Sequence, residues 1–186
     1  HEALPAAGRH AVIARQGKSV FGVEIKVVDE SGATLPRDGV AQGELMVRGQ
    51  WIVSRYFKGS ESPLRDGWFP TGDVATIDAD GVMQIRDRAK DVIKTGGEWI
   101  SSIDLENIAM GHPAVLEAAA IACRPPKWDE RPLLVVVKKP GADLTREELL
   151  AFFEGRIAKW WTPDDVAFVD AIPLGATGKM LKNRLR

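Results

Sequence analysis

The chain has 186 residues, of which 45% are hydrophobic and 27% are charged, a composition typical of a soluble globular protein. Lysine and arginine number 25 against 26 aspartate and glutamate residues, so the formal net charge of −1 gives no reason to expect binding to nucleic acid or to an anionic membrane. The single cysteine, Cys123, excludes an intramolecular disulfide framework and a multi-cysteine metal site. It lies in an apolar run, which favours a small buried hydrophobe, and it is compatible with a reducing, cytoplasmic compartment.

Neither a membrane anchor nor a leader is indicated. No apolar run approaches the roughly 18 residues that a membrane-spanning helix needs. The first fifteen residues do not show the signal-peptide order of charge, apolar core and cleavage site, and no initiator methionine is present. We therefore expect no transmembrane segment, and we expect the chain to be part of a longer protein.

The first half of the chain predicts β-structure. Phe21–Glu30 alternates apolar and polar side chains, as a half-buried strand does, and Asp80–Gly81 is a strong signal for a hairpin turn. The strands expected here are 21–30, 43–47, 73–77 and 82–85. Asp78 and Asp80 lack the rest of a calcium-binding loop, so we favour the turn. We expect a β-rich unit over residues 1–87, with an irregular start.

The second half predicts a compact α+β unit over residues 92–186. Ser101 is a candidate helix cap, and Thr145 with Glu148 forms a capping box ahead of an apolar stripe. The helices expected here are 101–110, 145–158 and one beginning at 179, and the expected strands are 115–123, 133–138 and 166–169. We expect the fold class α+β, with a mixed sheet packed against helices, and a joint between the units at residues 88–91.

Several common chemistries are excluded by the sequence. His1, His10 and His112 have no catalytic or metal-binding motif around them, so we interpret all three as structural or solvent-facing. Gly178–Lys179 resembles the end of a phosphate-binding P-loop. That loop requires a glycine five residues before its second glycine and a serine or threonine after the lysine, and this chain has Pro173 and Met180 there.

Two segments in the first half could carry chemistry. In GWFPTGD (67–73), the carboxylate of Asp73 could accept two hydrogen bonds from a vicinal diol such as that of a ribose. The plain alternative is a turn with a capping aspartate. The segment IRDRAKD (85–91) carries four charges in its last five residues, and its plain alternative is a solvated strand end.

Two further segments lie in the second half. In KTGGEWIS (94–101), adjacent glycines allow a ligand to approach the backbone closely beside the flat wall of a tryptophan. The alternative is a loop with a packed aromatic residue. In PLGATGKML (173–181), a lysine on a glycine loop could bring its charge to a phosphate or carboxylate, or it could be an ordinary exposed lysine.

Together, in this order and spacing, the segments resemble the adenylate-forming acyl-CoA synthetases, the superfamily that also includes luciferases and the adenylation domains of peptide synthetases. The resemblance covers nearly the whole chain from about Phe21. The matching motifs are GELMVRG, GWFPTGD, DRAKD, GGEWIS and PLGATGK. The run GGEWISSIDLEN followed by GHPAV is most similar to bacterial medium- and long-chain fatty acyl-CoA synthetases.

The resemblance implies a two-step reaction with ATP, Mg²⁺ and coenzyme A. The enzyme turns a fatty acid into an acyl-adenylate with release of pyrophosphate, and then passes the acyl group to the coenzyme A thiol. A small C-terminal domain rotates on a large N-terminal domain between the steps. Residues 1–87 would be the end of the large domain, 88–91 the hinge and 92–186 the small domain. The resemblance is also compatible with a homodimer.

Four residues match the family's adenylation machinery and hinge. Asp73 matches the aspartate that binds the ribose hydroxyls of ATP, and Arg88 matches the arginine that also contacts the ribose. Lys90 matches the hinge residue whose backbone torsions absorb the rotation. Lys179 matches the catalytic lysine, which would bridge the carboxylate and the α-phosphate.

Another group matches the path of the pantetheine thiol. Gly97 corresponds to the glycine that lets the thiol reach the adenylate, and Gly96 and Trp99 would line the tunnel. Asp87 replaces the glycine that often precedes the hinge arginine, which we interpret as a mark of the fatty acyl branch. Trp99 also stands where other branches bind coenzyme A phosphates.

Three hypotheses follow. The first is the C-terminal part of a fatty acyl-CoA synthetase. The second is another adenylate former, such as an aryl-CoA ligase or a peptide-synthetase module. The third is a non-catalytic nucleotide-binding module. No metal-binding residue is predicted in this chain. The family's phosphate loop and acyl pocket are absent from it, so we expect the 186 residues alone to catalyse neither step.

Overall fold

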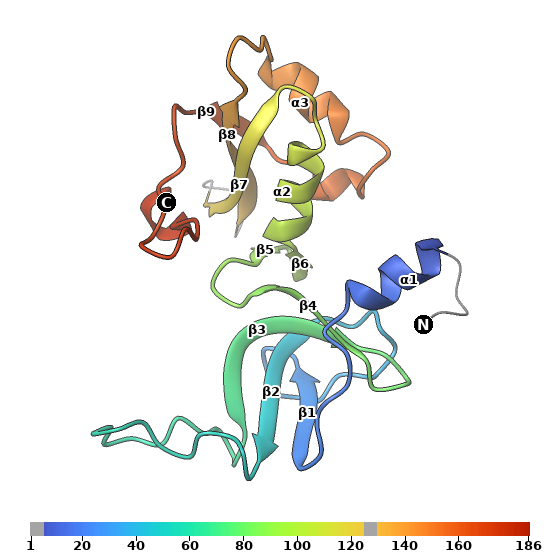
Figure 1. Cartoon of the computed structure of the whole chain (residues 1–186), viewed down its shortest axis with the longest axis vertical. Coiled ribbons are helices and arrows are strands. Elements are labelled where there is room, and N and C mark those ends of the chain that lie inside the picture. The colour runs from blue at the N-terminus through green and yellow to red at the C-terminus, as the bar shows by residue number, and fades with distance from the viewer. Residues whose placement is uncertain (1–5, 125–129) are drawn as a thin grey trace. The chain divides into compact units, whose positions relative to one another are not determined.

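The computed structural model describes residues 6–124 and 130–186. The chain divides into two compact units, with the boundary between Lys90 and Asp91 (Figure 1). Unit 1 contains the helix α1 and the strands β1–β4, and unit 2 contains all later elements. Each unit has its own hydrophobic core, so each is described by itself.

Unit 1 is built on an antiparallel sheet in the strand order β1-β2-β3-β4. Its elements are α1 (Ala6–Ile13), β1 (Val23–Val28), β2 (Gly43–Gly49), β3 (Phe69–Ile77) and β4 (Met83–Arg88). The alternation predicted from the sequence places Ile25 and Val27 in a core with Leu45, Ala75 and Ile77. The four predicted strands are confirmed, and β3 begins four residues earlier than expected.

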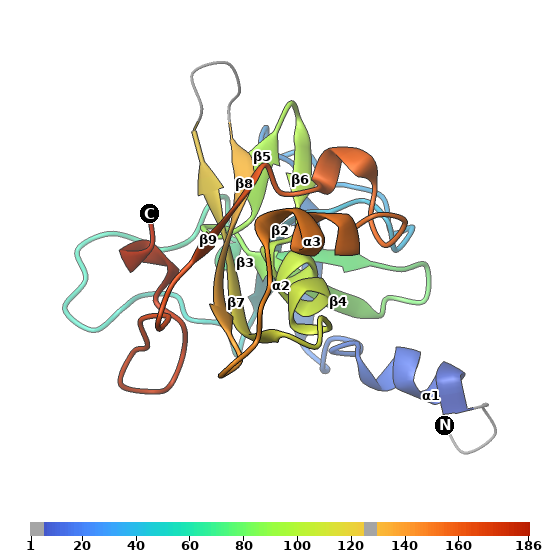
Figure 2. The same cartoon turned by 90° about the horizontal axis from the view of Figure 1, so that it is seen from above.

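Unit 2 contains a mixed sheet in the order β7-β8-β9, with β7 antiparallel and β9 parallel to β8. Its elements are β5 (Ile93–Thr95), β6 (Glu98–Ile100), α2 (Ser102–Met110), β7 (Val115–Cys123), β8 (Arg131–Lys138), α3 (Arg146–Phe152), β9 (Asp165–Phe168) and the short 3₁₀ turns η1 (Lys159–Trp161) and η2 (Lys182–Arg184). Figure 2 shows α2 and α3 on one side of this sheet and the C-terminal segment on the other. The predicted α+β class, with a mixed sheet packed against helices, is confirmed.

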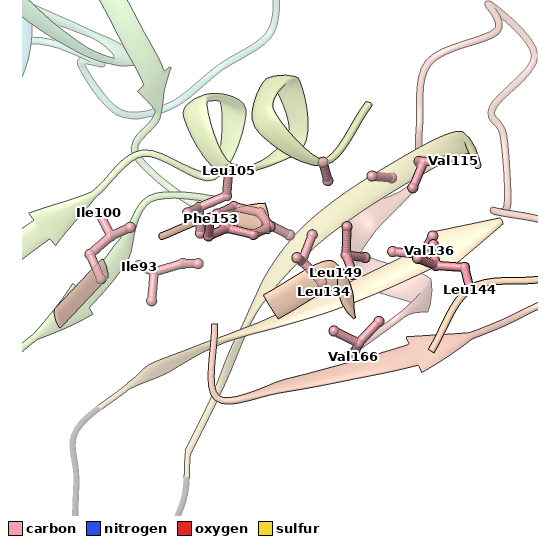
Figure 3. Close-up of a cluster of buried hydrophobic side chains, with 13 residues drawn as sticks. Ile93, Ile100, Leu105, Val115, Leu134, Val136, Leu144, Leu149, Phe153 and Val166 are labelled. Carbon is pink, nitrogen blue, oxygen red and sulfur yellow. The ribbon is translucent and has the colours of Figure 1, made fainter. Parts of the chain in front are cut away.

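Alternating side chains give this sheet two packed faces. Ala118 and Ala120 of β7 lie in the core beneath the helices, whereas Ala119 lies in a smaller core on the opposite face with Val137 and Ile172. Alanine is small enough to let both layers approach the strand closely. Figure 3 shows the larger core. Its labelled members are Ile93, Ile100, Leu105, Val115, Leu134, Val136, Leu144, Leu149, Phe153 and Val166.

Both predicted helix caps in unit 2 are confirmed. The hydroxyl of Ser101 accepts the N–H of Asp104 at 3.1 Å, which satisfies a donor that the first turn of α2 leaves unpaired. Thr145 and Glu148 form the full capping box: the Thr145 hydroxyl accepts the Glu148 N–H at 3.2 Å, and the Glu148 carboxylate accepts the Thr145 N–H at 2.8 Å.

Three helix predictions were wrong in extent or in kind. The start of the chain, expected to be irregular, forms α1 in its described part. The helix expected over 145–158 ends at Phe152, because the chain turns there and Gly155 takes a left-handed φ of +71°. The helix expected from Lys179 is absent; the chain there makes an isolated bridge between Leu174 and Met180, followed by η2.

Candidate functional site

Asp73 and Arg88 lie directly opposite each other on β3 and β4. The guanidinium of Arg88 contacts the Asp73 carboxylate with an Nη1–Oδ1 distance of 2.9 Å. The Asp73 side chain is 19% exposed and that of Arg88 is 55% exposed, so the pair lies at the surface of unit 1. A carboxylate has several acceptor positions, so Asp73 can keep this contact and still receive hydroxyl donors from a ligand.

The backbone around this pair is held by Gly72 and Asp87. Gly72 has a left-handed φ of +76°, and its carbonyl accepts the N–H of Ala89 at 2.9 Å. Asp87 is buried, and its carboxylate accepts the N–H of Arg88 at 2.7 Å. An aspartate at this position therefore contributes a hydrogen bond to the end of β4 that a glycine would lack.

Lys90 lies in a turn at the end of unit 1, and its side chain is exposed. The next residue but one, Val92, is already buried in unit 2. The packed interior of unit 2 therefore begins two residues after Lys90. Lys90 is exposed between the buried residues Asp87 and Val92, which is compatible with a hinge at this position.

Gly96 and Gly97 form the two-residue turn of a β-hairpin, β5–β6, which sequence reasoning had treated as a loop. Their φ values of +56° and +87° are those that the tight hairpin turn requires. The adjacent glycines were the signal that predicts such a hairpin. A Cβ at either position would meet no atom within 4 Å, so the space beside them is not filled by neighbouring residues. We call residues 93–100 the glycine hairpin.

Trp99 is half-buried on β6, opposite Lys94 on β5. The ammonium of Lys94 lies 4.9 Å from the Trp99 ring centroid, in cation–π contact. The hairpin is rooted by Ile93 and Ile100, which are fully buried in the core beneath the helices. The structure therefore places Gly96, Gly97 and Trp99 together at the end of a two-stranded element.

Lys179 lies on a second small hairpin, residues 173–181, which we call the lysine hairpin. Leu174 and Met180 form its bridge, and the N–H of Gly175 donates to the carbonyl of Lys179 at 2.8 Å. The N–H of Leu181 donates to the carbonyl of Pro173 at 2.8 Å, which closes the base. The Lys179 side chain is exposed.

The lysine hairpin is rooted on the opposite face of the sheet from the glycine hairpin. Met180 packs with Leu185 against Ala119 and Val137, in the smaller core. The same sheet therefore supports both hairpins through different faces. The sequence predicted the residues at the two tips, whereas their placement on opposite faces follows only from the packing of β7 and β8.

The other candidate groups have structural surroundings. The Nδ1 of His112 accepts the N–H of Ala114 at 3.2 Å, and its ring packs edge-on against Phe152. Cys123 is half-buried rather than fully buried, because it ends β7. Burial, with the charges of Asp165 and Asp164, raises the pKa of its thiol, which favours the unreactive form.

Within residues 6–124 and 130–186, no group of three or more histidine, cysteine, aspartate or glutamate side chains could hold a metal ion. Among the same described residues, no helix combines the length and apolar character needed to cross a membrane.

Comparisons with known proteins match this fold to the C-terminal part of adenylate-forming enzymes. Residues 104–179 match the family described as AMP-binding enzyme C-terminal domain. The ATP-bound structure of MatB from Rhodopseudomonas palustris superposes with a TM-score of 0.82 at 32% identity, over 93% of this chain and 35% of that one. The chain carries the AMP-binding enzyme C-terminal domain, and over nearly its whole length it is similar to adenylate-forming acyl-CoA ligases.

Curated relatives include ligases for different acids. The chain is 59% identical to the 3-methylmercaptopropionyl-CoA ligase of Ruegeria lacuscaerulensis, over 100% of its own length and 35% of that protein. It is 54% identical to the medium-chain-fatty-acid–CoA ligase of Ectopseudomonas oleovorans, over 92% of its own length and 32% of that protein. The chain thus spans about a third of the length of these relatives.

Proposed function

We propose that the full-length protein containing this chain is an AMP-forming ligase that activates a medium- or long-chain fatty acid and transfers the acyl group to coenzyme A. One observation carries this proposal. Unit 2 presents two hairpins from opposite faces of one sheet, one with an exposed lysine and one with an open pair of glycines. Two tips with different chemistry suit a domain that serves two successive steps.

In the first step, a carboxylate oxygen of the acid attacks the α-phosphorus of ATP, and the bond to pyrophosphate breaks. Asp73 would accept hydrogen bonds from the ribose hydroxyls, and Arg88 would hold the Asp73 carboxylate while contacting the ribose. Lys179 would place its ammonium between the acid and the α-phosphate as negative charge moves between them. A preorganised charge at this point stabilises the transition state more than the ground state.

In the second step, the coenzyme A thiolate attacks the acyl carbonyl carbon, and AMP leaves. Gly96 and Gly97 would let the pantetheine pass close to the backbone, because no neighbouring atom occupies the space where their side chains would be. Trp99 would form one wall of this path. A side chain at Gly97 would obstruct the thiol and would also strain the hairpin turn.

We place the hinge at residues 88–91, with Lys90 as the residue whose torsions change between the steps. The support is the exposed turn at the boundary between the units. On this assignment residues 1–87 belong to the large domain and 92–186 to the mobile one. Mg²⁺ would be bound outside this chain, as the family resemblance implies. We further propose that the enzyme is cytoplasmic.

Two acids are candidates for the substrate of the full-length enzyme. The medium-chain ligase at 54% identity supports a fatty acid, and the Ruegeria enzyme at 59% identity favours 3-methylmercaptopropionate as a second candidate. The two acids differ in length and in a thioether sulfur. Neither hairpin contacts the acyl chain in our assignment, so the choice depends on residues outside this chain.

The test is coenzyme A thioester formation by the full-length protein with ATP, Mg²⁺ and a panel of acids. The panel contains short, medium and long fatty acids, 3-methylmercaptopropionate and benzoate. We expect the highest kcat/KM with medium or long fatty acids. A maximum with 3-methylmercaptopropionate would establish the second candidate, and a maximum with benzoate would indicate an aryl-CoA ligase. Acyl-adenylate without thioester would contradict coenzyme A as acceptor.

A further inference from the structure

A charged cluster lies beneath the lysine hairpin, at a point that no motif in the sequence indicated. The ammonium of Lys182 contacts the Glu106 carboxylate at 2.6 Å and donates to the hydroxyl of Ser102 at 2.7 Å. The Lys182 and Glu106 side chains are each only 11% exposed. A lysine and a glutamate are rarely buried to this degree unless they are paired with each other.

Glu106 connects more than one element. Its Oε1 atom, which receives Lys182, also accepts the N–H of Ala120 at 2.8 Å. The carboxylate belongs to α2, the amide to β7 and the ammonium to η2. This single buried group therefore connects η2 to α2 and to the edge strand β7.

The lysine hairpin is joined directly to this anchor. Leu181 closes the hairpin through its N–H and also begins η2, since its carbonyl accepts the N–H of Arg184 at 2.9 Å. Lys182 follows immediately, three positions after Lys179. Any movement of Lys182 is therefore transmitted through two residues to the exposed ammonium at the hairpin tip.

The apolar contacts at the base cannot by themselves define this position sharply. Met180 and Leu185 pack on Ala119, Val137 and Ile172, and a flexible methionine can occupy several arrangements on such an apolar surface. A buried ion pair with a second hydrogen bond has a fixed geometry, because leaving either partner unpaired in the interior is costly. Orientation of the hairpin is thus better attributed to the charges than to the apolar contacts.

We infer that Lys182 and Glu106 form a positioning pair that sets the place of Lys179 for the adenylation step. This inference rests on the proposed function of Lys179. The pair touches no reacting atom in this assignment and acts through the hairpin. Its loss should slow the step that uses Lys179 and should spare the step that uses the glycine hairpin, because apolar contacts of Ile93 and Ile100 in the larger core hold that hairpin.

The experiment measures both half-reactions of the full-length protein separately, as pyrophosphate release with ATP and acid, and as thioester formation from supplied acyl-adenylate. The main variant is Lys182→Met, which keeps the length of the side chain and removes its charge. We expect the kcat of adenylation to fall about 100-fold, the loss typical of a misplacement near 1 Å. The KM for ATP and the rate of thioester formation should stay within about 3-fold of the wild-type values, because neither depends on the position of Lys179 in our assignment. A loss of folded protein would instead lower the rates of both half-reactions together.

Glu106→Gln is the second variant, and it decides the matter if Lys182→Met does not fold. It keeps an oxygen for the Ala120 amide while removing the charge that faces Lys182, so it should lower adenylation selectively as well. The double variant should lose no more than the worse single one, because both changes break the same pair. Lys138→Met is the matched control: Lys138 is half-buried in the same unit but contacts Leu144 and Phe168. Both its half-reactions should keep the wild-type rates.

The outcomes separate this inference from the proposed function. Lys179→Ala is measured in parallel. If Lys179→Ala abolishes adenylation while Lys182→Met and Glu106→Gln behave like the control, the positioning pair is refuted and the proposed function stands. Equal loss of both half-reactions in Lys182→Met would also refute it, since the role would then be only structural. If Lys179→Ala retains adenylation, the proposed function fails and this inference fails with it.

Discussion

The glycine hairpin and the lysine hairpin are of similar size and belong to the same unit, yet different interactions stabilise them. The glycine hairpin is a regular two-stranded turn whose conformation depends on two left-handed glycines, and its root is apolar. The lysine hairpin has one bridge and a few backbone hydrogen bonds, and its root is fastened by a buried ion pair. The first is shaped by its own residues, whereas the second is placed by residues distant in sequence.

The difference is what the proposed function requires of a small domain that serves two steps. A tip that must admit a ligand close to its backbone needs glycine conformations and open space. A tip that must deliver one charge needs a fixed point of attachment. Ile93 and Ile100 hold the glycine hairpin in the larger core, and Met180 of the lysine hairpin packs on the smaller core, so a change at one tip should leave the other tip in place.

The largest expected effect follows from removing the charge at the tip of the lysine hairpin. In the full-length protein, Lys179→Ala should lower the kcat of acyl-adenylate formation by about 1000-fold, because a preorganised charge is lost from the transition state. Pyrophosphate release measures this step. Lys139→Ala, which removes another exposed lysine of unit 2, is the control and should retain the wild-type rate. Normal adenylation by the Lys179→Ala enzyme would contradict the proposed role of the lysine hairpin in this step.

A somewhat smaller effect is expected at the glycine hairpin. Gly97→Leu should slow thioester formation from supplied acyl-adenylate by about 100-fold, because the side chain would displace the thiol from its path. It would also force leucine into a φ near +87°. Gly141→Leu controls for that strain, since Gly141 has a φ of +74° and open space but lies in neither hairpin. Equal loss in the two variants would assign the effect to strain alone.

Under the proposed function, Asp73 would serve both steps, because it would hold the nucleotide in each of them. Asp73→Asn removes the charge and keeps the shape, so the KM for ATP should rise about 10-fold, the loss of one charge-assisted hydrogen bond. Steady-state kinetics with varied ATP measures it. Glu44→Gln breaks a comparable pair, Glu44–Arg65 at 2.9 Å, in the same unit and should leave the KM unchanged. A rise in both variants would point to the sheet rather than to the ribose.

The smallest expected effect concerns stability on the helix face. The Thr145 backbone N–H, with the Thr145 hydroxyl, hydrogen-bonds the Glu148 carboxylate and lowers its pKa. A lowered folded-state pKa means that the contribution is present above the unfolded pKa, about 4.3, and is lost as the pH falls through the folded value. Glu148→Gln should therefore flatten the decline of the melting temperature of the full-length protein below about pH 5. Glu147→Gln is the control, and a decline unchanged by Glu148→Gln would contradict the capping contribution.

Local signals predicted much of this fold. Ser101 and Thr145 predicted the starts of α2 and α3, because a cap is chosen by residues within three positions of it. The alternation of apolar and polar residues in Phe21–Glu30 predicted β1, because it too is a pattern of neighbouring residues. The end of α3 was predicted too late because an apolar stripe continues past Phe152, whereas Gly155 and the packing of the chain decide where the helix stops.

In the candidate site, too, the residues of contiguous motifs could be predicted, whereas contacts between distant positions could not. Asp73, Arg88, Gly97 and Lys179 could be named from motifs because each motif is short and contiguous. The pairing of Lys182 with Ser102 joins positions 80 residues apart, and no local pattern indicates it. The burial of Glu106 follows only when α2 is laid on β7. Residues that we propose to contact a ligand could therefore be named from the sequence, whereas those that we propose to position them required the structure.

The most direct test of the account measures both half-reactions side by side in Lys179→Ala and Gly97→Leu. The account predicts a crossover: Lys179→Ala loses adenylation and keeps thioester formation, and Gly97→Leu keeps adenylation and loses thioester formation. The ratio of the adenylation rate to the thioester-formation rate should therefore fall in Lys179→Ala and rise in Gly97→Leu. Parallel loss of both rates in both variants would contradict the division of labour between the two hairpins.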